Sequence, residues 1–110
     1  MVESNFQSKL KKEIKDRFPG CYILKNDPTI IQGIPDLTIL YKDRWAALEV
    51  KKDERAYKAS LKKNPNQQIH VDRLNQMSYA AFIYPENKEE VINDLKRAFR
   101  VARKTCNVQS

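Results

Sequence analysis

The chain has 110 residues, with 21 Lys and Arg against 14 Asp and Glu, which gives a formal net charge of +7. This length fits a single domain over residues 1–110 and is sufficient for a hydrophobic core without disulfides. At 41% hydrophobic and 32% charged residues, the composition is that of a globular protein and excludes a disordered tail. No apolar run approaches the length of a membrane span or signal sequence, so we expect an intracellular, cytoplasmic protein with no membrane partner.

The counts of cysteine, histidine and glycine exclude several kinds of site. Two Cys and one His cannot form the spaced ligand pairs of a zinc site, and two distant Cys do not make a disulfide framework. Two Gly are too few for a glycine-rich phosphate loop. Any chemistry therefore has to use carboxylates, amines and a hard metal ion. The excess of basic residues favours a polyanionic partner such as nucleic acid.

The first half of the chain predicts one helix followed by three strands. Residues 4–18 should form a helix, with Ser4 as N-cap and an apolar stripe at Phe6, Leu10, Ile14 and Phe18. A short strand over residues 21–25 should lead into a turn-rich segment over residues 26–35. Residues 36–41 and 44–51 are rich in β-branched and aromatic residues and predict a hairpin that turns at Lys42-Asp43.

The second half of the chain begins with a segment whose predicted structure is less regular. We expect residues 52–65 to form a loop with a partial helix, and residues 66–77 to form a helix with Ile69, Leu74 and Met77 facing inward. A buried strand over residues 80–84 and a last helix from residue 88 to about 103 should follow. The order α-β-β-β-α-β-α predicts an α/β domain with a mixed β-sheet flanked by helices.

The hairpin brings two carboxylates together. A turn centred between Lys42 and Asp43 places Asp36 opposite Glu49, with their Cβ atoms about 5 Å apart on one face. Such a pair repels itself unless a divalent cation such as Mg²⁺ or Mn²⁺ lies between the carboxylates. Lys51 shares that face because strand side chains alternate. Two hard ligands and an amine are the groups that metal-dependent phosphodiester hydrolysis uses.

These residues carry a resemblance to a known family. GIPD at residues 33–36, followed thirteen residues later by EVK at residues 49–51, resembles the motif of the PD-(D/E)XK nuclease superfamily, which implies its restriction-endonuclease-like core. GIPDL, ALEVK, PNQ at residues 65–67 and AAFIYPEN at residues 80–87 resemble the VRR-NUC branch, small nucleases found in many phages and similar to Holliday junction resolvases. The likeness covers residues 3–95. It departs at Met77-Ser78-Tyr79, where relatives commonly carry a glycine.

The resemblance implies roles for six residues. The metal-binding positions would be Asp36, Glu49 and the carbonyl of Val50. The catalytic positions would be Lys51, which orients the nucleophile, Glu3 from the first helix, and Gln67 from the later helix.

The function implied is a Mg²⁺- or Mn²⁺-dependent endonuclease that hydrolyses DNA, either as plain duplex or as branched and flapped structures. Small members of the superfamily often act as dimers, so a homodimer is implied as well. The basic residues that follow Glu49 in the chain should contact DNA: Lys52, Arg55 and Lys58. The alternative is a non-catalytic nucleic-acid binding module that retains the nuclease fold.

Each candidate also has a plainer interpretation. Glu3 could serve only the helix dipole, and Gln67 competes with Gln68 as an ordinary surface amide. His70 is more often a surface histidine than a substrate contact, and Trp45 is more often a packing residue than a stacking platform for a base. The pairing of Asp36 with Glu49 is the feature that the plainer interpretations explain least.

Overall fold

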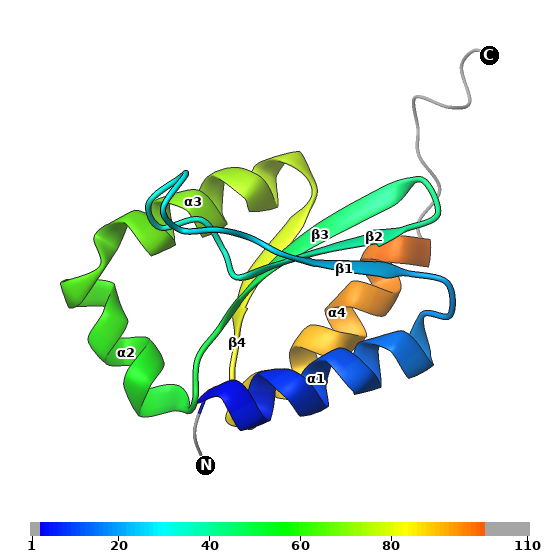
Figure 1. Cartoon of the computed structure of the whole chain (residues 1–110), viewed down its shortest axis with the longest axis horizontal. Helices are drawn as coiled ribbons and strands as arrows, with labels where there is room; N and C mark the ends of the chain where they lie inside the picture. The colour runs from blue at the N-terminus through cyan, green and yellow to red at the C-terminus, as the bar shows by residue number, and fades with distance from the viewer. Residues whose placement is uncertain (1–2, 101–110) are drawn as a thin grey trace.

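The computed structural model describes residues 3–100, and their order of elements is shown in Figure 1. The elements are α1 (Glu3–Arg17), β1 (Tyr22–Lys25), β2 (Leu37–Tyr41), β3 (Arg44–Val50), α2 (Glu54–Lys63), α3 (Pro65–Met77), β4 (Tyr79–Ile83), a 3₁₀ turn (Pro85–Asn87) and α4 (Lys88–Arg100). The end of the last predicted helix, with Ala102 and Arg103, lies outside the described residues. Within residues 3–100, no helix is both long and apolar enough to cross a membrane.

The strands form one mixed sheet in the order β1-β2-β3-β4. The pairs β1–β2 and β2–β3 are antiparallel, and β3–β4 is parallel. In the hairpin, Tyr41 pairs with Arg44 and Leu37 pairs with Leu48, so the predicted register is confirmed. Asp36 immediately precedes the first paired residue of β2 and is thereby brought next to Glu49.

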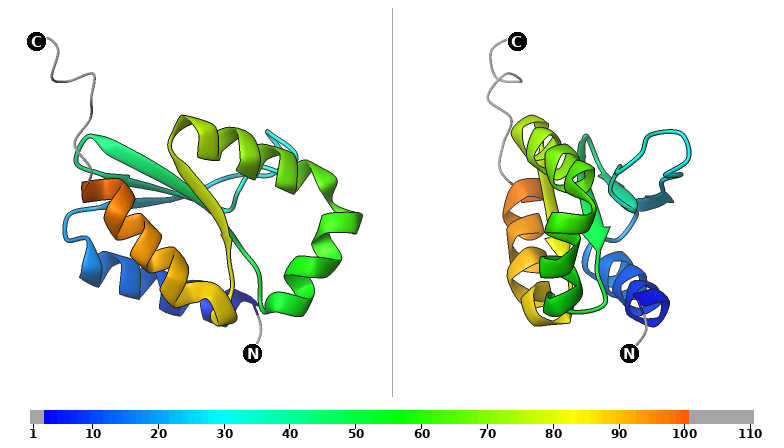
Figure 2. Two further views of the ribbon diagram at one scale, coloured as in Figure 1. Left: turned by 180° about the vertical axis from the view of Figure 1, so that it is seen from behind. Right: turned by 90° about the vertical axis from the view of Figure 1, so that its left-hand side faces the viewer.

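The central strand β3 is buried on both faces. Ala46, Leu48 and Val50 belong to the larger core, which α1 and α4 cover. Ala47 belongs to a smaller core with Val71 of α3, on the opposite face. Figure 2 shows α1 and α4 near one another and α2 and α3 as a separate arch. By alternation, Glu49 faces the arch, so the candidate site and the larger core lie on opposite faces of one strand.

The first helix follows its predicted apolar stripe. Phe6, Leu10, Ile14 and Phe18 are all buried, and Phe6, the most exposed of the four, is only 5% exposed. The prediction of Ser4 as N-cap is wrong, because the helix already includes Glu3. An acidic residue in the first turn is favourable there, since the amino end of a helix carries partial positive charge.

The sequence predicts a loop with a partial helix over the segment 52–65, and the structure shows that the helical part, α2, takes up most of it. Its N-cap is Asp53, whose side chain accepts a hydrogen bond from the Ala56 N–H at 2.7 Å. Tyr57 of this helix stacks on Tyr84 and tilts against Phe82, and the residue of α2 that is buried is Ser60. A helix that buries a serine and packs through an aromatic ring is not readily recognised from an apolar period in the sequence.

The inward face of α3 also differs from the prediction. Ile69 and Met77 are exposed, whereas Val71 is buried and Leu74 packs beside it. The spacing of Gln67, Val71 and Leu74 is that of one helical face, so Gln67 lies on the inward stripe. The reason is that α3 contacts the sheet along a narrow line, which leaves apolar residues on its flanks in solvent.

Ser78 replaces the glycine that the resemblance suggests before the last strand. Its φ is −149°, so this position does not adopt the left-handed conformation that favours glycine. The Ser78 hydroxyl donates a hydrogen bond to the Trp45 carbonyl and ties the end of α3 to the start of β3.

Gly33 lies where the turn-rich segment packs against α3, and we expect glycine to be essential at this contact. Its φ is 85°, and an added Cβ would lie 2.8 Å from the Cβ of Asn66. Gly33→Ala should therefore lower the free energy of unfolding by about 2–3 kcal/mol, through backbone strain together with steric overlap. Gly20→Ala is the matched control, because Gly20 has a φ of 89° but an added Cβ would meet no atom within 4 Å. Urea denaturation measures both decreases in stability, and equal decreases would contradict the close contact.

Candidate functional site

The site is built on two carboxylates at the end of the β2–β3 hairpin. The backbone N–H of Asp36 donates to Glu49 Oε1 at 3.2 Å, and the backbone N–H of Val50 donates to Asp36 Oδ2 at 2.9 Å. Each strand therefore fixes the side chain of the other. Glu49 is only 3% exposed and Asp36 is half-buried, so the pair lies largely out of water.

Burial of this pair has an electrostatic cost. Desolvation raises the pKa of Glu49 to about 7, and the neighbouring Asp36 carboxylate adds to the rise. Burial also raises the pKa of Asp36, although its hydrogen bond from Val50 opposes the change. The carboxylates are held close together by the backbone in spite of their mutual repulsion.

Lys51 brings an amine to the same place. Its Nζ lies 3.4 Å from Glu49 Oε2 and donates a hydrogen bond to Gln67 Oε1 at 2.9 Å. Only 9% of Lys51 is exposed, so its position is constrained by packing. The structure thus brings Gln67 of α3 into contact with the strand residues that the sequence singled out.

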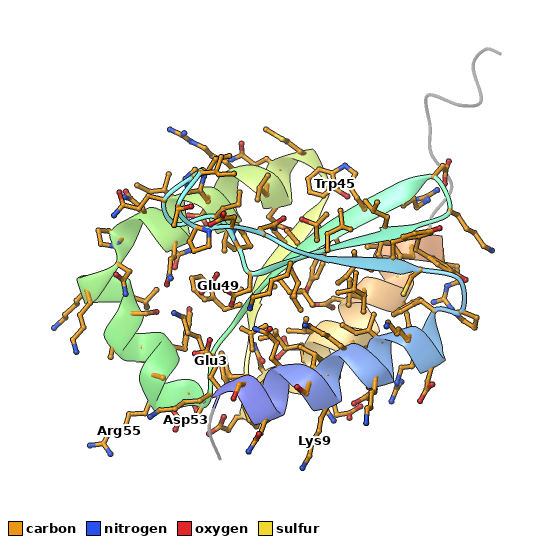
Figure 3. All side chains as sticks on the ribbon, in the orientation of Figure 1. Glu3, Lys9, Trp45, Glu49, Asp53 and Arg55 are labelled. Carbon is orange, nitrogen blue, oxygen red and sulfur yellow. The ribbon has the colours of Figure 1, made fainter. Side chains whose placement is uncertain are left out.

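Glu3 reaches the site from the amino end of α1. Figure 3 shows it between the Glu49 side chain and the start of α2. Partial burial raises the pKa of Glu3, with a further rise from Asp36, while Lys51 opposes it. Glu3 is thus close enough to feel the charges of both central residues, although it remains exposed to solvent.

A basic pocket of about 590 Å³ opens beside Lys51, between α1 and α2. Its basic lining consists of Lys51, Lys52, Arg55 and Lys63. Lys58 does not line it and instead pairs with Glu54 at 3.2 Å on the exposed side of α2. Sequence reasoning missed the contribution of Lys63, although Arg55, Ala59 and Lys63 have the spacing of a single helical face.

The donor set fits a hard divalent cation. Among residues 3–100, no group of three or more His, Cys, Asp or Glu is placed to hold a metal ion. Asp36 and Glu49 form a pair, and one or two carboxylates with several waters are the usual ligands of protein-bound Mg²⁺. A cation between them would also relieve the repulsion that raises the pKa of Glu49. The Val50 N–H donates to Asp36 Oδ2, which holds the Val50 backbone beside the carboxylate pair.

Trp45 and His70 lie apart from these contacts. Trp45 packs against the smaller core beside Ala47 and Val71, as a packing residue would. His70 is half-buried on α3, and no hydrogen bond or ion pair joins it to another residue within 3–100.

Comparison with known proteins does not assign the chain to a family. No family model, no curated protein and no solved structure matches it. The function therefore has to be inferred from the geometry of the site itself.

The burial of Glu49 predicts a pH-dependent stability in the absence of metal. Its pKa is about 7 in the folded protein against an ordinary 4.5, so the folded state holds the extra proton between these values. Stability should therefore fall as the pH rises from 4.5 to 7, by a total of about 3 kcal/mol. Glu49→Gln removes the charge. The gain in free energy of unfolding of this variant over the wild type should therefore be near zero at low pH and reach its full size above pH 7. Urea denaturation in a chelating buffer at several pH values measures this difference.

Glu90→Gln is the control, because Glu90 is an exposed glutamate on α4. Added Mg²⁺ should stabilise the wild type in the alkaline range and leave Glu49→Gln unchanged, since ligands stabilise the state that binds them. The absence of any advantage for Glu49→Gln above neutral pH would contradict the strained pairing of Glu49 with Asp36.

Proposed function

We propose that the protein is a divalent-metal-dependent endonuclease that hydrolyses phosphodiester bonds of DNA. The observation that carries the proposal is the buried pair Asp36 and Glu49 with the amine of Lys51 3.4 Å from Glu49. A structural role does not account for two adjacent buried carboxylates, because burial without a cation raises their pKa values.

The fold is compatible with a PD-(D/E)XK nuclease. The observed order from α1 to β4 contains a helix, an antiparallel β-meander of three strands and a parallel fourth strand reached through helices. With α2 counted as an additional helix in the crossover, this order is compatible with the α-β-β-β-α-β core that the resemblance implies. The order of elements supports the proposal, and the residues of the site carry it.

Each residue has a distinct part in this proposal. Asp36, Glu49 and the Val50 carbonyl would hold Mg²⁺ or Mn²⁺, which would supply charge neutralisation at the phosphate and an activated water. Lys51 would orient the attacking water and stabilise the charge that develops on the phosphoryl oxygens. Gln67 would hold the Lys51 amine in place through its 2.9 Å hydrogen bond. Glu3 would reach the same centre from α1.

The basic pocket supports a nucleic-acid substrate. Its four basic residues outnumber the two acidic ones in the lining, Glu3 and Asp53. It opens directly beside Lys51, so a phosphate held there would lie next to the carboxylate pair. The excess of positive charge on the whole chain would assist encounter with any polyanion.

Isosteric substitution of either carboxylate should abolish cleavage. Asp36→Asn and Glu49→Gln retain oxygens that can accept the hydrogen bonds from Val50 and Asp36, so the fold should persist. Lys51→Ala should lower the single-turnover rate on the order of 10²-fold, as removal of one positioned donor does. The measurement is cleavage of labelled duplex, flap and junction DNA in Mg²⁺, Mn²⁺ or chelator.

Lys58→Ala is the matched control for Lys51→Ala, because Lys58 is exposed and pairs with Glu54. It should cleave at the wild-type rate. Normal cleavage by the Asp36→Asn protein would remove the carboxylate pair from the mechanism. DNA binding by the wild type without cleavage in either metal would favour the non-catalytic binding module instead.

The salt dependence of DNA affinity should show whether the basic residues of the pocket contact phosphates. Replacing Lys52, Arg55 and Lys63 with Ala should flatten the slope of log affinity against log salt by about 0.9 for each phosphate that the protein no longer neutralises. Replacing Lys58 and Lys62, which lie on α2 outside the pocket lining, should change the slope less. Fluorescence anisotropy in Ca²⁺ would measure both, and equal effects would mean that the basic residues of the pocket form only a solvated face.

A further inference from the structure

A second pocket adjoins the basic one across the junction of α2 and α3. It has a volume of about 260 Å³ and lies between the turn-rich segment and the start of α3. Lys63 and Asn64 line both pockets, and the Lys51–Gln67 hydrogen bond joins a residue of one to a residue of the other. Three residues of the candidate site therefore line the two pockets: Glu3 and Lys51 line the first, and Gln67 lines the second.

The two pockets differ in chemistry. The first is lined by four basic residues and suits phosphate. The second contains only one charged residue, Lys63, and four side-chain amides: Gln32, Asn64, Asn66 and Gln67. We call it the amide pocket. Amides both donate and accept hydrogen bonds, which is the capacity needed to read the edge of a nucleobase.

The hydrogen-bonding groups of the amide pocket are available to a ligand. Within the described residues, the side chains of Gln32, Asn64 and Asn66 have no hydrogen-bond partner. Asn64 occupies the N-cap position of α3, where an asparagine side chain ordinarily accepts a hydrogen bond from a backbone N–H, yet its side chain makes no such bond. Gln67 uses its Oε1 to accept from Lys51, which leaves its amide nitrogen free to donate.

The size and the apolar surfaces of the amide pocket also suit a nucleobase. Pro28 and Pro65 give it flat apolar surfaces among the amides. At about 260 Å³ it lies slightly below the range of pockets for drug-sized ligands, so it suits one base rather than a base pair. Gly33 packs so closely on Asn66 that any side chain at position 33 would disturb this wall.

We propose that the amide pocket binds a single unstacked nucleobase of the strand whose phosphate lies in the basic pocket. This inference rests on the proposed function insofar as it requires a nucleic-acid ligand. It implies a substrate with an unpaired nucleotide beside the phosphate that is attacked, as in a single strand or a flap. A fully paired duplex would have to release a base from its stack to fill the pocket, which costs free energy.

The test compares a short single-stranded DNA with a strand of equal length made entirely of abasic nucleotides. Both carry the same phosphates, so they differ only in their bases, whatever register the protein adopts. In Ca²⁺, anisotropy should give the wild type an affinity on the order of 10-fold higher for the strand with bases. It should also bind this strand more tightly than the corresponding duplex.

Gln32→Ala and Asn66→Ala should each reduce this preference several-fold while leaving affinity for the abasic strand unchanged, because both residues line the amide pocket and neither lines the basic one. Gln76→Ala is the control, because Gln76 is an exposed amide on α3 that does not line the pocket, and it should keep the preference. Circular dichroism checks that each variant folds. Equal affinity of the wild type for the two strands would overturn the proposal, as would variants that weaken both strands alike.

Cleavage measured in Mg²⁺ on the same strands separates this inference from the proposed nuclease activity. Base-dependent binding that Gln32→Ala and Asn66→Ala weaken, without cleavage, would support the amide pocket and overturn the nuclease. Cleavage with no preference for bases over the abasic backbone in binding would overturn the amide pocket and leave the nuclease standing.

Discussion

The close approach of two carboxylates at the end of β3 is the constraint on which the rest of the site depends. Glu49 is almost completely buried, and its partner Asp36 is held by the backbone of the neighbouring strand. Repulsion and desolvation oppose this arrangement, so the surrounding fold has to stabilise it. Strand β3 contributes to this stabilisation, because its alternate residues Ala46, Leu48 and Val50 lie in the larger core. The same strand therefore places apolar side chains in the core on one face and the candidate site residue Glu49 on the other. A change that disturbs the core packing of β3 would also disturb the position of Glu49.

The parts of the fold that follow from local pattern could be predicted from the sequence. The register of the β2–β3 hairpin depends on a short turn and on alternation, and both can be read without knowing the tertiary structure. The stripe of α1 likewise repeats every four residues and is buried as expected. The hairpin register already brings Asp36 next to Glu49, and strand alternation places Lys51 on their face. The central geometry of the candidate site was thus accessible to sequence reasoning.

The arch of α2 and α3 was less predictable, because its packing depends on partners that are distant in the chain. Tyr57 anchors α2 by contact with Phe82 and Tyr84 rather than through a regular apolar stripe. Ile69 has the hydropathy of a core residue but lies on an exposed flank of α3, since the sheet covers only a narrow line of that helix. Lys63 joins the basic pocket only because α2 is a helix along its full length. Hydropathy alone does not carry this information.

The contact of Gly33 with Asn66 has a consequence for how the protein could discriminate among ligands. Because the backbone of the turn-rich segment packs against the first turn of α3, neither can approach the other further. The contact therefore sets a lower limit to the width of the space between them. If the amide pocket binds a base as proposed, the pocket could not contract around the base at this wall. A ligand smaller than the space would then fit loosely, so one glycine contact would disfavour small ligands.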